Sequence, residues 1–253
     1  MLVSYSKKFL FLRVPKTGGT SINAALLPYH NPHERKLYAR LIRRLPLVPT
    51  PYQFQAFDAH PHWSMLKAKC ILPEGLFNSF FKFSFVRHPV DWQISVFKHI
   101  LRYEHLDDFA AEFAEVYKHP SFEDYIRWRI DHGPIPQVAQ MVDRDGRLLL
   151  DYVGRFENLR CDFETVCRMI NIPPPALEHL NQNPHDQSVV INSALFRLIY
   201  DAYKLDFETF GYGERSLIEG WTFDPPKKIP EIVETLQRAG GEDFNPWKTN
   251  ILW

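Results

Sequence analysis

The chain has 253 residues, of which 45% are hydrophobic and 24% are charged, with 30 basic and 30 acidic side chains. This composition predicts a globular protein with a substantial core, and its balanced charge excludes a global attraction to nucleic acid or to an anionic membrane. The three cysteines, none in a CxxC pattern, form no even disulfide framework and indicate reduced thiols.

Predicted strands and helices alternate from the N-terminus. An aromatic and branched run predicts a buried strand over 9–14, followed by a helix over 20–27 that Pro28 ends. The run FFKFSFV predicts a second strand over 80–86, followed by a helix over 89–103 with proline in its first turn. Further helices are predicted over 33–45, 64–72, 107–118, 121–130, 162–170 and 192–210, and a third strand over 147–157. This order predicts an α/β fold with a central, mainly parallel sheet flanked by helices, and functional sites beyond the carboxyl ends of the strands.

The loop VPKTGGTS, residues 14–21, lies between the first predicted strand and its helix. A helix start presents unpaired N–H groups and the positive end of the helix dipole, and glycine lets the backbone approach an anion closely. The candidate phosphate ligands are Lys16, Thr17, Gly18, Gly19, Thr20 and Ser21. The loop is not a Walker A motif, because its lysine precedes the glycines. The residues alone leave open a plain strand-to-helix turn in which Thr20 is the N-cap and Lys16 is solvated.

The segment FVRHPVDWQISVF, residues 85–97, has the same organisation. Arg87 follows the second predicted strand, and Ser95 lies about two helical turns further on. These two side chains can hold a second phosphate through charge-assisted hydrogen bonds. The alternative is an ion pair between Arg87 and Asp91 that only caps the helix. Two such sites on neighbouring strands point to one ligand with two separate phosphates, such as a 3′,5′-bisphosphorylated nucleotide.

Five segments resemble a family of carbohydrate sulfotransferases, that of the heparan sulfate and chondroitin sulfotransferases and their bacterial relatives. In chain order they are PKTGGTS, FVRHPVDWQISVF, VGRFENLRCDFETVC, HLNQN and LIYDAYKLDFETFGY. The first resembles the family's 5′-phosphosulfate loop and the second its 3′-phosphate segment. Three residues depart from the usual 3′-phosphate pattern: His88 replaces asparagine, Trp92 replaces an arginine, and Phe97 replaces a tyrosine. The substitution at Trp92 puts one polar contact with the ligand in doubt.

The resemblance implies a P-loop-NTPase-like three-layer fold, with a sulfotransferase domain over 1–213 and a tail over 214–253 packed on it. It also implies the donor 3′-phosphoadenosine 5′-phosphosulfate and transfer of its sulfuryl group to a hydroxyl of a carbohydrate or similar acceptor. Lys16 would stabilise the leaving oxygen, residues 17–21 would hold the 5′ phosphate, and Arg87 and Ser95 would hold the 3′ phosphate. No metal is implied, because lysine and backbone N–H groups meet the leaving charge.

The acceptor hydroxyl needs a general base, and a histidine with a pKa near neutrality suits this role. The segment FDAHPHWSML contains His60 and His62. The resemblance places a histidine in this region. His60 is the first candidate, because Trp63 and Leu66 follow it at helical spacing, and His62 is the second. It also relates His132 and Gln137, in HGPIPQ, to positions near the acceptor cleft.

Two other functions compete with sulfotransfer. A P-loop kinase-like phosphotransferase needs a magnesium-binding aspartate at a strand end, where this chain has Arg87. A non-catalytic protein that binds a bisphosphonucleotide is left open by Trp92.

We found no apolar run of membrane-spanning length and no signal-peptide pattern, so we expect a cytoplasmic, bacterial-type protein. The balanced charge predicts that the chain has no nucleic-acid partners. The sequence does not determine the acceptor or the oligomeric state.

Overall fold

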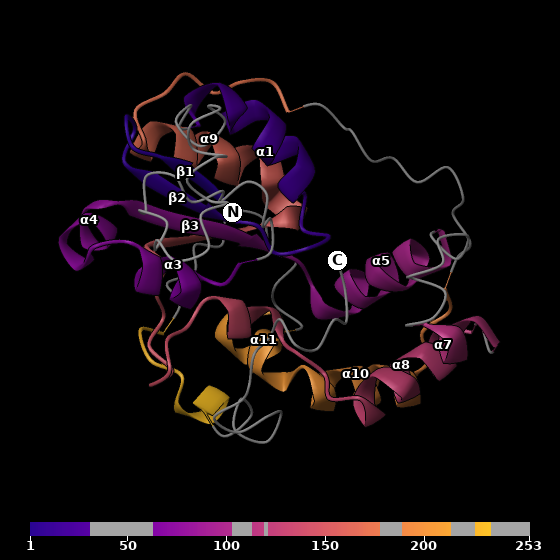
Figure 1. Cartoon of the computed structure of the whole chain (residues 1–253). Helices are drawn as coiled ribbons and strands as arrows, with labels where there is room; N and C mark the ends of the chain where they lie inside the picture. The colour runs from indigo at the N-terminus through magenta and orange to yellow at the C-terminus, as the bar shows by residue number, and fades with distance from the viewer. Residues whose placement is uncertain (31–62, 103–112, 119–120, 178–188, 214–225, 234–253) are drawn as a thin grey trace, which may run out of the picture. The chain divides into compact units, whose positions relative to one another are not determined.

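The computed structural model of the chain describes residues 1–30, 63–102, 113–118, 121–177, 189–213 and 226–233 (Figure 1). The chain divides into two compact units. The first contains residues 1–86, 140–144 and 148–182, and the second contains residues 87–139, 145–147 and 183–253. The loop 14–21 therefore belongs to the first unit, and Arg87 and Ser95 belong to the second.

The first unit is built on a four-stranded sheet in the order β1-β2-β3-β4. Its strands are β1 (Leu2–Ser4), β2 (Phe9–Leu12), β3 (Phe81–Val86) and β4 (Tyr152–Arg155). β1 pairs antiparallel with β2, whereas β2 with β3 and β3 with β4 are parallel. The mixed α/β class and the mainly parallel sheet are thus confirmed, and the finer P-loop-like assignment stays a prediction.

One face of this sheet is covered by two helices, α1 (Gly19–Leu26) and α9 (Leu159–Met169), which lie on the same side in Figure 1. Alternate residues of a strand point to the same face, so the phenylalanines of β2 and β3 meet these helices together. The buried cluster contains Phe9, Phe11, Phe83, Phe85, Ile22, Leu26, Phe163 and Val166. The rings of Phe11 and Phe83 stack with centroids 5.1 Å apart. This packing fixes the start of α1 against the end of β2.

Lys82 lies between Phe81 and Phe83 on β3, on the strand face opposite to their rings, and is only 7% exposed. Its ammonium group donates a hydrogen bond to the carbonyl of Phe80 at 2.6 Å and pairs with Asp151 at 2.8 Å. It also lies 5.3 Å from the ring centre of Phe77, which belongs to α4 (Glu74–Ser79). The buried charge is satisfied by these partners, so a lysine is tolerated in a strand that is otherwise apolar. The other short elements of this unit are η1 (Leu27–Tyr29), α3 (Met65–Ile71) and η5 (Phe156–Asn158).

The described part of the second unit is mainly helical. Its elements are α5 (Pro89–Arg102), α7 (Ala114–Lys118), α8 (Phe122–Asp131), η4 (Gln137–Gln140), α10 (Ser193–Ala202) and α11 (Lys204–Thr209). α5, α8 and α10 contact one another. Their buried side chains include Trp92, Val96, Ile100, Tyr125, Ile126, Leu195 and Ile199.

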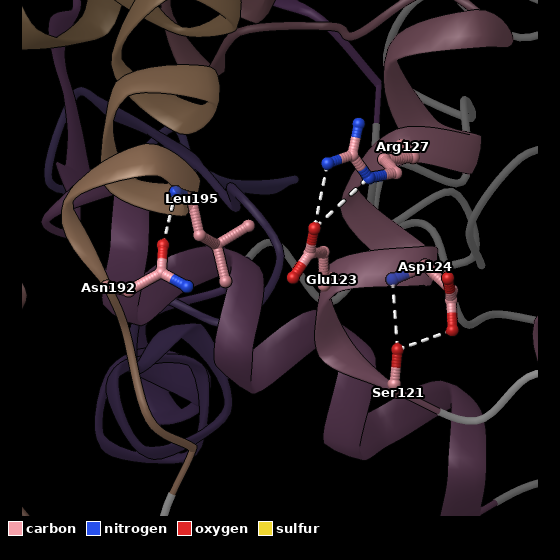
Figure 2. Close-up of polar contacts among 6 residues, drawn as sticks. All are labelled: Ser121, Glu123, Asp124, Arg127, Asn192 and Leu195. Atoms are coloured by element: carbon pink, nitrogen blue, oxygen red, sulfur yellow. Dashed lines mark hydrogen bonds and ion pairs between the residues drawn. The ribbon is translucent and has the colours of Figure 1, made fainter.

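Side-chain caps explain where two of these helices begin (Figure 2). The hydroxyl of Ser121 accepts a hydrogen bond from the backbone N–H of Asp124 at 3.1 Å, which caps α8. The side-chain oxygen of Asn192 accepts from the N–H of Leu195 at 2.8 Å, which caps α10. Such caps satisfy N–H groups that have no partner within the helix.

Three predicted elements differ clearly from the structure. The helix predicted over 192–210 is wrong as a single helix, because Tyr203, with φ −115°, separates α10 from α11. The strand predicted over 147–157 shortens to β4, and α9 begins at Leu159, earlier than predicted. The carboxylate of Asp162 in α9 accepts a hydrogen bond from the N–H of Arg155, the last residue of β4, at 2.7 Å. Hydrophobic periodicity does not reveal such a contact between a helix and the strand before it. The predicted helix over 33–45 lies outside the described residues.

Candidate functional site

The loop after β2 turns through two residues with positive φ. Lys16 has φ 63° and Gly18 has φ 82°, and α1 starts at Gly19. For a lysine this backbone conformation costs about 1–2 kcal/mol, and such strain is found preferentially at functional sites. The lysine predicted to act in catalysis is therefore held in an unusual conformation between a buried strand and a helix start.

Thr17 is 1% exposed, and its hydroxyl donates a hydrogen bond to the carbonyl of Val14 at 2.8 Å. This bond closes the loop on itself, so the hydroxyl proton of Thr17 is already engaged. Thr20 is exposed and Ser21 is partly exposed in the first turn of α1. Of the three hydroxyl groups predicted to bind phosphate, those of Thr20 and Ser21 are thus the better placed to donate to a ligand.

Within the described residues, the N-terminus of α1 has no side-chain cap. Its N-cap residue, Gly18, makes no side-chain capping hydrogen bond, and the first turn contains no acidic residue. The alternative in which Thr20 caps this helix is therefore wrong. The positive end of the helix dipole is left without a compensating group from the helix itself, which favours an anion there.

Gly18 packs directly against the segment RFENL of the third family motif. A Cβ atom on Gly18 would lie 2.9 Å from a methyl group of Leu159 and 3.3 Å from the ring of Phe156. Glycine is required here both for the positive φ and for this close packing. The contact brings the loop 14–21 and the segment 155–159 together in the first unit.

Arg13 was not identified by the sequence analysis, although it comes immediately before the loop. Its side chain lies next to Gly19, where a Cβ atom would be 3.5 Å from Nε of the guanidinium group. Burial lowers the pKa of Arg13. A partly buried cation beside an uncapped helix start strengthens the preference of this place for an anion. The position of Arg13, between the end of a strand and a glycine loop, was the sequence signal that could have identified this residue.

The second predicted loop begins where β3 ends, at Val86, and Arg87 is the next residue. Arg87 is partly exposed, and its backbone is held by the side chain of Gln137, whose Oε1 accepts from the N–H of Arg87 at 3.0 Å. Ser95 is partly exposed on α5. The two residues predicted to hold the 3′ phosphate therefore both belong to the second unit and keep access to solvent.

The three departures from the family's 3′-phosphate pattern lie in packed surroundings. Trp92 is 3% exposed and meets the ring of Tyr203 edge-on at 5.8 Å, so it serves the core rather than a polar ligand. Phe97 packs against Tyr125 at 5.3 Å. The ring of His88 lies 5.4 Å from that of Phe207, in the closing motif LDFETFGY. The second and last family motifs thus pack together in the second unit.

Both candidate bases, His60 and His62, lie outside the described residues. His132 is exposed at the end of α8, where its ring stacks on Trp128 at 4.7 Å. Gln137 is fully buried. Within the described residues, no group of three His, Cys, Asp or Glu side chains is arranged to hold a metal ion.

The strand–loop–helix geometry and the parallel strand pairs place the first unit in the α/β class. A family model described as the sulfotransferase family matches residues 1–213. The chain therefore belongs to this family, as the five motifs predict, and it is a sulfotransferase whose acceptor bears a hydroxyl group. No curated protein and no solved structure matches the chain. None of the described helices is long and apolar enough to cross a membrane.

Proposed function

We propose that the chain transfers the sulfuryl group of 3′-phosphoadenosine 5′-phosphosulfate to a hydroxyl of a carbohydrate or similar acceptor. The observation that carries this proposal is the loop after β2. Two positive-φ residues, Lys16 and Gly18, lead there into a helix start without a side-chain cap or an acidic residue. This combination favours a phosphate or phosphosulfate group.

The residues of the first unit act on the 5′ end of the donor. The N–H groups of residues 17–21, with the hydroxyls of Thr20 and Ser21, bind the 5′ phosphate, and Arg13 adds positive charge. Lys16 stabilises the bridging oxygen, on which negative charge grows as its bond to sulfur breaks. The acceptor oxygen forms the new bond to sulfur, and its proton passes to His60, with His62 as the alternative base. The products are the sulfated acceptor and adenosine 3′,5′-bisphosphate.

In the second unit, Arg87 and Ser95 bind the 3′ phosphate. A guanidinium group forms paired charge-assisted hydrogen bonds with phosphate oxygens, and a serine hydroxyl adds one more donor. Residues 1–213 form the catalytic domain in this proposal, and residues 214–253 are a tail that packs on it. The family match, which ends at residue 213, supports this division.

A thermal-shift series tests the proposal. At a hundredfold excess over Kd, a ligand stabilises the native state by about 2.7 kcal/mol. For a chain of this size that corresponds to a rise in Tm of roughly 5–10 °C. Adenosine 3′,5′-bisphosphate should give such a rise at concentrations at which AMP and ATP give little.

The two competing functions predict other outcomes. An equal response to ATP with magnesium would point to a phosphotransferase and contradict the proposal. Stabilisation by the bisphosphate without sulfation of any glycan, lipid or phenol in a broad panel would point to a non-catalytic binding protein.

A further inference from the structure

The backbone of Arg87 is held by one side chain from a distant part of the sequence. The carboxamide of Gln137 accepts from the N–H of Arg87 at 3.0 Å and donates to the C=O of the same residue at 2.8 Å. Gln137 is fully buried, so water does not compete for these bonds. A carboxamide carries an acceptor oxygen and an NH₂ donor side by side, which matches the N–H and C=O of one residue. The residue that follows β3 is therefore clamped on both of its backbone groups.

Gln137 is itself fixed by Asp206 of α11. The carboxylate accepts from the N–H of Gln137 at 2.8 Å and from the N–H of Val138 at 3.0 Å. It also lies 3.4 Å from Nε2 of Gln137. In its ionised form Asp206 has no hydrogen to donate, so it directs the amide nitrogen toward itself and leaves Oε1 to face the N–H of Arg87. Asp206 thus sets the orientation that the clamp needs.

The same helix holds the next residue along the chain. Phe207 follows Asp206 and meets the ring of His88 edge-on at 5.4 Å. Two consecutive residues of α11 therefore fix two consecutive residues after β3, one through the amide of Gln137 and one through a ring contact. Asp206 is 0% exposed and has no contact with solvent that a catalytic acid or base would need.

We infer that Gln137 and Asp206 are positioning residues, which hold the backbone of Arg87 so that its guanidinium group meets the 3′ phosphate of the nucleotide. This inference rests on the proposed function, because it takes Arg87 as a nucleotide ligand. A long arginine side chain transmits any rotation of its backbone to the guanidinium group, and misplacement of about 1 Å can cost a hundredfold in activity. The clamp thus selects for a phosphate at the 3′ position without touching the ligand.

The test measures the ratio of two affinities, that for adenosine 3′,5′-bisphosphate over that for AMP, which lacks the 3′ phosphate. The single variants are Gln137→Met, Asp206→Asn and Arg87→Ala. In two double variants, Gln137→Met or Asp206→Asn is combined with Arg87→Ala. Gln137→Met should lower the ratio by at least about tenfold, the size expected for lost charge-assisted bonds, while AMP affinity stays within about twofold. In the Arg87→Ala background, Gln137→Met should not lower the ratio further, because the guanidinium group that it positions is already absent.

Gln140→Met is the matched control, because Gln140 lies in the same short helix and its side-chain oxygen has no hydrogen-bond partner among the residues that the structure describes. It should leave the ratio unchanged. If Gln137→Met does not fold, Asp206→Asn decides, because it replaces one of the two oxygens that accept from the N–H groups of Gln137 and Val138 by an NH₂ donor.

The possible failures are distinct. A wild-type chain with no preference for the bisphosphate would overturn the proposed function. A wild-type preference that survives in Gln137→Met, or in Asp206→Asn where that variant decides, would overturn the inference alone. A uniform loss of affinity for both nucleotides would also overturn it, because this is the mark of a purely structural role.

Discussion

The loops that follow β2 and β3 start at the carboxyl ends of two neighbouring parallel strands, yet they are held by different means. The first closes through a contact between Thr17 and Val14, three residues apart, and turns through positive-φ residues of its own. The second is held by Gln137, 50 residues further along the chain. The first loop is therefore shaped largely by its own sequence, whereas the second depends on a scaffold assembled from remote segments.

If remote contacts hold the second loop, a local substitution in the segment 85–97 should lower the free energy of unfolding. Replacing Trp92 by arginine restores the family's usual residue, but it places a charge where an indole packs against Tyr203. We expect Trp92→Arg to lower the free energy of unfolding by about 3–5 kcal/mol, as loss of a buried aromatic side chain and burial of a charge both destabilise. Urea unfolding measures this loss.

Trp92→Phe serves as the control for this experiment and should lose clearly less stability, because it keeps an aromatic ring next to Tyr203. A Trp92→Arg variant that is as stable as wild type and binds the bisphosphate more tightly would show that position 92 reaches the nucleotide.

The first loop should be more sensitive in chemistry than in stability. We expect Lys16→Ala to lower kcat by about 10²–10³-fold, the usual effect of removing one group that stabilises a leaving oxygen. Steady-state sulfation kinetics measure it. Lys8→Ala is a matched control, because Lys8 also has positive φ, at 51°, but is exposed in the turn between β1 and β2. Equal activity losses in the two variants would remove the special role of Lys16.

The two glycines of the first loop should differ. Gly18→Ala meets both a φ of 82° and a methyl group of Leu159 at 2.9 Å, so we expect a loss of about 1–3 kcal/mol in the free energy of unfolding. Gly19→Ala makes only ordinary contacts, at 3.5 Å or more, and should be close to neutral for stability. Thermal or urea unfolding of both variants separates them, and equal losses would contradict the geometry described for Gly18.

The smallest expected change, counted per pH unit, concerns the pH dependence of the second loop's scaffold. Burial raises the pKa of Asp206 to about 7, against the opposing pull of the N–H groups of Val138 and Gln137. Because the folded chain then binds this proton more tightly than the unfolded chain, the contribution to stability is complete below about pH 4 and is lost as pH rises through 7. The slope between these values is at most about 1.4 kcal/mol per pH unit.

Urea unfolding of wild type and Asp206→Asn between pH 5 and pH 8 measures this slope. The variant should show a flatter pH dependence, because its side chain does not titrate. Parallel curves for the two proteins would show that Asp206 keeps an ordinary pKa.

The sequence predicted those features whose determinants are adjacent in the chain. About twenty residues contain the strand before the first loop, the glycines and the helix after them. The hydrophobic pattern and the conformational freedom of glycine were therefore enough to locate these elements. The parallel sheet followed from the alternation of strands and helices. The start of α3 was predicted to within one residue because Ser64, its N-cap, stands directly before it.

Features that depend on remote contacts escaped prediction. Nothing near Arg87 in the sequence shows that Gln137 binds its backbone, and a resemblance had related Gln137 to the acceptor cleft. The break at Tyr203 was missed because apolar residues continue through it at helical spacing. The edge strand β1 has only three residues, which is too short for a periodic signal. Both candidate bases, His60 and His62, lie outside the described part of the chain, so the catalytic histidine stays a prediction, as does the acceptor.

The contact of Gly18 with Phe156 and Leu159 has a consequence for synthesis of the chain on the ribosome. A nascent chain that ends before β4 already contains the glycine loop but lacks the side chains that brace it. The loop can reach its final shape only after more than half of the protein has emerged. Nucleotide added during translation should therefore protect long nascent chains from proteolysis and leave shorter ones as sensitive as before.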